Sequence, residues 1–262
     1  MSSLPDYTLR FMQYLDLMLL FGLPLFAWYG PVASTIGGDK RSPQPRWALT
    51  RGLLVCGVLG LALVGIEIVR STAGIMGGAV SDLVRDDLAW YLFDTAAGRA
   101  GLTRAFLLVL LLAVLGWQSQ RAERPFPIRR VTLLAGVALV SLAWNGHAAS
   151  GEGVSGTVRL VAGMAHLLAA GGWIGAIFAL LILFVRHGKP AAGEGLHMLW
   201  RALHTFSRPG TVFVGVLVVT GILHYGDLVG WSIAPLFHSR HGNLMLLKLA
   251  LFAAMLGLAA LH

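Results

Sequence analysis

Two histidines stand in apolar surroundings, where a titratable ring is unexpected. His166 lies in MAHLLAAGGWIGA (164–176), and His147 lies in WNGHAAS (144–150), at the end of another apolar run. Neutral imidazole is the commonest metal ligand and suits copper, zinc, iron and nickel. Because the only cysteine is Cys56, neither an internal disulfide nor a Cys-x-x-Cys metal clasp can form. A metal site would combine His with Met or carboxylate ligands, which suits copper, while two axial histidines would equally ligate a haem.

The composition places these histidines in a membrane protein. The chain has 262 residues, of which 56% are hydrophobic and 12% charged, about half the charged share of a soluble domain. Several apolar runs approach the ~20 residues that a helix needs to cross a bilayer, without the alternation of barrel strands. We therefore expect an all-α, polytopic transmembrane helical bundle, a single domain over 1–262, with seven helices near 10–31, 48–69, 101–117, 131–149, 158–185, 209–227 and 243–261.

The basic residues predict how the bundle is oriented. The loops 39–51, 118–130 and 185–208 hold twelve Lys or Arg and three acidic residues, whereas the rest of the chain holds eight and nine. If seven helices alternate, these loops share one side, which the positive-inside rule places in the cytoplasm. The N-terminus is then outside, and its sequence lacks a signal-peptide pattern, so we expect the first helix to be retained. The net charge of +8 reflects topology and gives no support to nucleic-acid binding.

The segment 70–100, between the second and third helices, is too polar to span a membrane. Its apolar residues predict a short amphipathic helix on the outer surface, formed around Leu83, Leu88, Trp90, Tyr91 and Leu92.

Six ionisable groups fall in the outer part of the predicted bundle: Asp16, Glu67, His147, His166, His224 and Lys248. A charge in hydrocarbon costs about 2.5–3.5 kcal/mol on insertion scales, so such groups are usually paired or functional. Local pairing is the ordinary explanation for the acids, since Glu67 is close to Arg70 and Asp16 is close to Arg10 and Gln13. His166 is too deep to reach the interface easily, and His147 is its nearest partner in depth.

We expect the metal ligands to come from His147, His166, Asp16, Glu67 and His224. Three further residues are candidates for capturing an ion outside the membrane: His238 and His241 in PLFHSRHGN, and Met76. A solvated loop is the alternative for the two histidines, and packing is the alternative for Met76.

Small residues in the fifth helix predict that another helix packs tightly beside His166. Gly171 and Gly175 form a small-xxx-small pair, which lets two helix backbones approach closely.

The order of the motifs resembles a known family. NGHAAS, HLLAAGGWIGAIFALLILF, FSRP…VLVVTGIL and GNLMLLKLALFAAMLGLAALH follow one another as in the copper-resistance D (CopD/PcoD) family of bacterial inner-membrane proteins. The resemblance implies copper handling, with uptake across the inner membrane and a periplasmic copper carrier of the CopC type as partner. His147 and His166 match the family's motif histidines, whereas His241 stands where the family often has Tyr. Members usually have eight helices.

Three functions are therefore considered. The first is copper binding and transport by a multi-pass protein of the bacterial inner membrane, surrounded by lipid. The second is a membrane haem b protein that transfers electrons, and the third is a copper-binding assembly subunit without transport. The sequence shows no nucleophile–base arrangement and no phosphate-binding loop, so we do not expect an enzyme.

Overall fold

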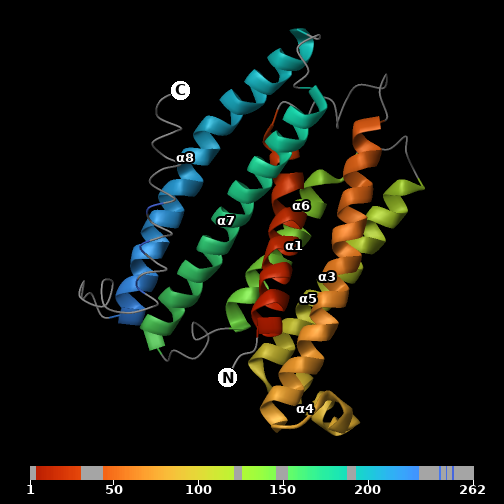
Figure 1. Ribbon diagram of the computed structural model, residues 1–262, viewed down its shortest axis with the longest axis vertical. Helices are drawn as coiled ribbons and strands as arrows, with labels where there is room; N and C mark the ends of the chain where they lie inside the picture. Colours follow the sequence, from red (N-terminus) through yellow and green to blue (C-terminus); the bar gives the residue numbers. More distant parts are fainter. Residues whose placement is uncertain are drawn as a thin grey trace. The chain divides into compact units, whose positions relative to one another are not determined.

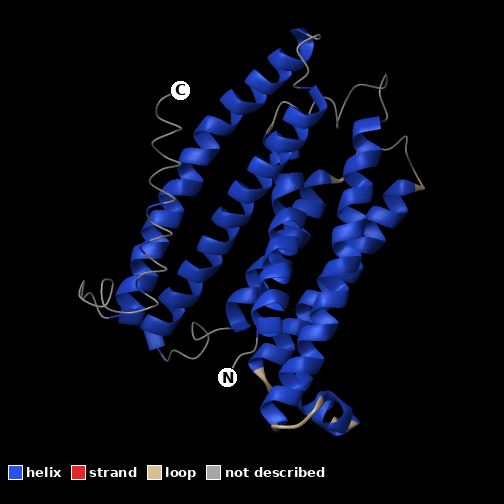
Figure 2. Cartoon of the chain, in the orientation of Figure 1, coloured by secondary structure: helices blue, strands red, loops and turns tan. Residues whose placement is uncertain are grey.

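The computed structural model describes residues 4–30, 44–120, 126–145, 153–187 and 193–229, together with Gly242, Leu246 and Ala250. All regular structure in these residues is helical (Figure 2). Contacts divide the chain into a larger unit, Met1–Thr220, and a smaller one, Gly221–His262. The single domain expected over 1–262 stays a prediction.

Seven α-helices and two short 3₁₀-helices make up the described part (Figure 1). In chain order they are α1 (Leu4–Tyr29), α3 (Gln44–Met76), η1 (Val80–Asp82), α4 (Arg85–Asp94), α5 (Ala96–Ser119), α6 (Ile128–Val140), η2 (Ser141–Asn145), α7 (Gly153–His187) and α8 (Gly193–Val229). Five helices contain stretches long and apolar enough to cross a membrane: Asp6–Tyr29, Leu49–Met76, Ala96–Ser119, Gly156–Val185 and His197–Gly226. The predicted all-α membrane bundle is confirmed, and the helix predicted over 243–261 lies almost wholly outside the described residues.

The larger unit is built around α1, which contacts α3, α6 and α7 (Figure 1). The closest crossing is with α7: a Cβ built on Gly22 would lie 2.7 Å from the Cα of Gly175 and would overlap the carbonyl of Gly171. Only residues without side chains permit this approach. The glycine pair predicted on the fifth helix therefore brings α7 against α1.

A second layer of packing joins α5 to α3 and α6. Its buried stripe on α5 consists of Arg104, Leu108, Leu111 and Leu115, each fully buried. These positions recur at spacings of four and three, so they share one face of the helix. Arg104 is the polar member of an otherwise apolar stripe.

The short helix predicted between the second and third spanning helices is present as α4, preceded by η1. α3 extends past the predicted end at residue 69 to Met76, where Gly77 adopts a left-handed conformation with φ of 70°. Such a glycine commonly ends a helix. Tyr91 is the buried residue of α4, and Thr95 caps the start of α5 by accepting a hydrogen bond from the Gly98 amide at 2.9 Å.

The fourth helix ends earlier than predicted. α6 stops at Val140 and tightens into η2, whereas the prediction continued to 149. The cause is local, because the Ser141 hydroxyl donates to the Ala138 carbonyl at 2.6 Å and so competes with the α-helical pattern.

The sixth helix begins earlier than predicted. Residues 193–208 were expected to form part of a cytoplasmic loop, but α8 starts at Gly193 and continues through Pro209. Ala202 and Phe206 lie one turn apart and pack against a cluster that includes Phe26 and Ala176. This apolar contact favours the helix on the N-terminal side of the proline and compensates for the hydrogen bond that proline cannot donate.

Candidate functional site

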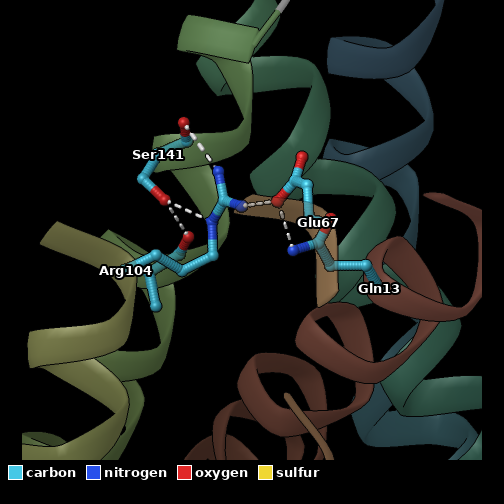
Figure 3. A network of polar contacts seen from close by, with 5 residues as sticks. Gln13, Glu67, Arg104 and Ser141 are labelled. Carbon is cyan, nitrogen blue, oxygen red and sulfur yellow. Dashed lines mark hydrogen bonds and ion pairs between the residues drawn. The ribbon is translucent and has the colours of Figure 1, made fainter. Parts of the chain in front are cut away.

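A buried ion pair joins four elements of the larger unit (Figure 3). Arg104 Nη1 and Gln13 Nε2 both donate to Glu67 Oε2, each at 2.8 Å. On its other side, Arg104 donates from Nε to Ser141 Oγ at 2.9 Å and from Nη2 to the Ser141 carbonyl at 3.3 Å. Arg104 is 0% exposed and Gln13 is 1% exposed. The network fixes α1, α3, α5 and η2 relative to one another in the membrane-spanning region.

Arg104 was missed by the sequence analysis because the third helix was expected to begin at 101. That start would place Arg104 in the first turn, at the membrane interface. α5 instead begins at Ala96, so Arg104 lies more than two turns inside the helix. The signal that identifies it is its position at the head of the stripe that continues with Leu108, Leu111 and Leu115.

The two acidic candidates have partners other than those expected from local sequence. Arg70, expected as the partner of Glu67, instead binds Asp6 at 2.5 Å in an exposed ion pair. Glu67 binds Arg104, which lies 37 residues away in the chain. Gln13, an expected neighbour of Asp16, donates to Glu67. Long-range helix packing therefore decides these pairings.

His166 is held by α8. Its Nδ1 lies 2.8 Å from the Thr220 hydroxyl oxygen, and Thr220 is 5% exposed. At about 1.5 Å rise per residue, His166 lies about 15 Å along α7 from Gly156, where the spanning stretch begins. The depth of this imidazole in the membrane stays a prediction.

The Thr220 hydrogen bonds assign a tautomer to His166. The Thr220 hydroxyl donates to the Val216 carbonyl at 2.6 Å, so its oxygen accepts from the imidazole. The proton then resides on Nδ1, and Nε2 carries the lone pair. Metal-binding histidines are commonly oriented in this way, with the second ring nitrogen donating to an oxygen.

Contacts between α1 and α7 set the relative depth of the polar groups. Met18 lies 3.6 Å from a Cβ built on Gly171, and Gly22 contacts Gly175. The two helices run parallel, so the same pairing can be followed toward their N-terminal ends. There His166 on α7 lies at about the height of Gln13 on α1, and Asp16 lies roughly one turn further along α1. The imidazole and the Glu67–Arg104 network therefore lie at similar depth on two flanks of α1.

Asp16 is 4% exposed and faces α3 on the side of the helix that carries Cys56 and, one turn later, Gly60. A Cβ built on Gly60 would lie 2.6 Å from Asp16 Oδ2. Cys56, the single cysteine of the chain, lies one turn before Gly60 on the same face of α3.

The other candidates are only partly placed. Met76 is 42% exposed at the end of α3, and His224 is half-buried in the smaller unit. His147, His238 and His241 lie outside the described residues. In the ranges that the structure describes, no three His, Cys, Asp or Glu side chains gather as a metal site. The shared site of His147 and His166 stays a prediction.

A cavity of about 320 Å³ lies between α5 and the α6–η2 segment. Its lining includes Arg99, Thr103, Ser141 and Trp144. Ser141 belongs both to this cavity and to the Arg104 network, so the buried network has one member at the cavity wall.

Two family models match the sequence. One, described as copper resistance protein D-like, N-terminal domain, covers residues 1–157, and the other, copper resistance protein D, covers residues 200–262. The chain belongs to the copper resistance protein D family. The resemblance seen in the motifs is thereby confirmed.

Relatives of this family member come from three bacteria. Copper resistance protein D of Pseudomonas syringae pv. tomato is 34% identical over 96% of this chain and 78% of its own length. Copper transport protein CutJ of Bacillus subtilis is 31% identical over 78% of this chain and 37% of its own length. Inner membrane protein YebZ of Escherichia coli is 25% identical over 96% of this chain and 80% of its own length. No solved structure matches the chain. With its spanning helices, this family member is a multi-pass protein of the bacterial inner membrane.

Proposed function

We propose that this protein binds copper and carries it inward across the inner membrane, with His166 as a ligand in the outer half of the bundle. The observation that carries the proposal is the His166–Thr220 contact at 2.8 Å, which orients an imidazole within a membrane-spanning helix. The names of two relatives, copper resistance protein D and copper transport protein CutJ, support copper as the cargo.

We further propose that His147 completes the site and that a periplasmic carrier of the CopC type delivers the ion. His238 and His241 would receive it outside the membrane, and Met76, exposed at the end of α3, offers a soft thioether at that end of the helix. The Glu67–Arg104 network has a supporting role, because its polar atoms already bind one another.

The test is copper flux into proteoliposomes that contain the purified protein. Wild type is expected to accumulate copper, and His166→Ala is expected to lose at least about tenfold of the rate. His204→Ala is the matched control, because His204 is exposed on α8 and stacks on Trp200. Uptake by His166→Ala at the wild-type rate would overturn the assignment of His166. Copper binding without flux would indicate an assembly subunit.

A further inference from the structure

The Asp16 carboxyl group is buried within the bundle with one oxygen unsatisfied. Asp16 is 4% exposed, and its Oδ2 has no hydrogen-bond partner among the residues that the structure describes. Burial of a carboxylate without a partner is costly, and ionisable residues at such depth usually mark an ion or proton site. Some partner for Oδ2 is therefore expected in the working protein.

The space beside this oxygen is bounded by a thiol and a glycine. Asp16 Oδ2 contacts α3 at Gly60, and Cys56 precedes Gly60 by one turn on the same face of that helix. Gly60, one turn further along α3, has no side chain, and a Cβ there would approach Oδ2 to 2.6 Å. The absence of a side chain at Gly60 therefore lets the Asp16 carboxyl group pack directly against α3.

Neighbouring polar groups do not compete for this position. Gln13 lies one turn before Asp16, but its amide donates to Glu67, which in turn binds Arg104. Leu108, which is fully buried, has its Cδ1 3.4 Å from a Cβ built on Gly60, and Cys56 packs against the apolar cluster that contains Leu108. Asp16 and Cys56 are therefore polar residues beside an apolar cluster, separate from the His166–Thr220 pair.

We propose that Cys56 and Asp16 bind a Cu⁺ ion between α1 and α3, as a second metal position. The inference rests on the proposed function for the identity of the cargo. Thiolate is a soft ligand that selects Cu⁺ and balances its charge, and the Asp16 carboxyl group offers an oxygen as the second ligand. On binding, the Sγ–H bond is replaced by an Sγ–Cu bond and the proton leaves to water, so the charge of the site is unchanged.

This position gives the ion a second binding site near the middle of the membrane. Asp16 lies about 15 Å along α1 from Asp6, where the spanning stretch begins. On the register between α1 and α7, that depth is roughly one turn beyond His166. An ion released from His166 would thus find a thiolate and a carboxylate across α1, on the inner side of the imidazole.

The experiment uses the single cysteine of the chain. Purified full-length protein is titrated with Cu⁺ in anaerobic detergent solution, and the thiolate-to-copper charge-transfer absorbance is recorded. Because Met and His do not give this band, wild type and His166→Ala should show it and Cys56→Ser should not. In Asp16→Asn, half-saturation should need at least about tenfold more Cu⁺. Size-exclusion elution and the thermal midpoint confirm that each variant is folded.

The outcomes separate this inference from the proposed function. If folded wild type transports copper but gives no thiolate band, the Cys56–Asp16 site is wrong and transport stands. If Asp16→Asn needs the same Cu⁺ concentration as wild type for half-saturation, the Cys56–Asp16 site is also wrong. If the band appears as expected while His166→Ala transports at the wild-type rate, the second site stands and the role of His166 is wrong.

Discussion

Arg104 on α5 and Glu67 on α3 form an ion pair with a Nη1–Oε2 distance of 2.8 Å inside the membrane-spanning region, where the arginine side chain is 0% exposed and the glutamate 16%. Gln13 donates to the same Glu67 oxygen, and Ser141 accepts from two further nitrogens of Arg104, so α1 and η2 are fixed by the same contacts. A satisfied network of this kind rigidifies the helices that contribute to it.

Removing one charge of this pair should destabilise the protein strongly. Arg104→Met removes the cation that faces Glu67, and loss of one partner of a buried pair costs about 3–5 kcal/mol. The double variant Arg104→Met with Glu67→Met should recover part of that loss, because it leaves no buried charge. Chemical denaturation in detergent measures the free energy of unfolding. The exposed Asp6–Arg70 pair is the control, where Arg70→Ala should cost about 0–1 kcal/mol. Equal losses in Arg104→Met and Arg70→Ala would contradict the account.

Adding one methyl group at the α1–α7 crossing should separate the two helices. In Gly22→Ala the new Cβ would overlap the Gly171 carbonyl, which cannot move as a side chain can. We expect a loss of at least about 1–3 kcal/mol of stability, as for overpacked cores. Gly65→Ala on α3, which has nothing within 4 Å of its built Cβ, should be neutral or stabilising. The thermal midpoints of unfolding of the two variants are compared with that of wild type. A Gly22→Ala protein as stable as wild type would contradict the close contact between α1 and α7.

Thr220 should affect copper affinity through His166. Thr220→Val keeps the shape of the side chain but removes the oxygen that accepts from Nδ1, so the ring loses its fixed tautomer and orientation. Loss of such an outer partner typically weakens metal binding about 10–100-fold. Competition with a chelator of known affinity measures the change, with Thr211→Val, exposed on the same helix, as control. If Thr220→Val binds copper with the wild-type affinity, the prediction that Thr220 orients His166 for copper binding is wrong.

The orientation predicted from the basic loops can be tested with single cysteines. In a Cys56→Ser background, Ser81→Cys in η1 and Ser119→Cys at the end of α5 place exposed thiols at opposite ends of the helices. A membrane-impermeant thiol reagent added to intact cells should label Ser81→Cys and spare Ser119→Cys. The reverse pattern would show that the N-terminus is inside.

The helical architecture was readable from the sequence because lipid demands long apolar stretches, and these dominate the composition. The glycine pair on the fifth helix was readable for a similar reason, since Gly171 and Gly175 repeat at the spacing of one face. Helix ends were harder to predict. α6 ends where the Ser141 side chain bonds the Ala138 carbonyl, and α8 starts before Pro209 because Ala202 and Phe206 pack with the distant residues Phe26 and Ala176.

The polar pairings could not be predicted, because they depend on how the helices are rotated. Glu67 had a plausible partner three residues away in Arg70, yet it faces α5, while Arg70 faces Asp6. Cys56 and Asp16 are forty residues apart, and nothing in either local sequence indicates that they meet. Depth can be estimated from one sequence, whereas helix rotation requires the structure.

The most direct test of the central claim is the copper and haem content of detergent-purified protein, by elemental analysis and absorbance, for wild type beside His147→Ala and His166→Ala. The account predicts copper in wild type, a substantial loss of it in each variant, and no Soret band. Copper retained at the wild-type level by both folded variants would contradict the histidine site. A Soret band in wild type that disappears in the two variants would show that the histidines bind a haem instead of copper.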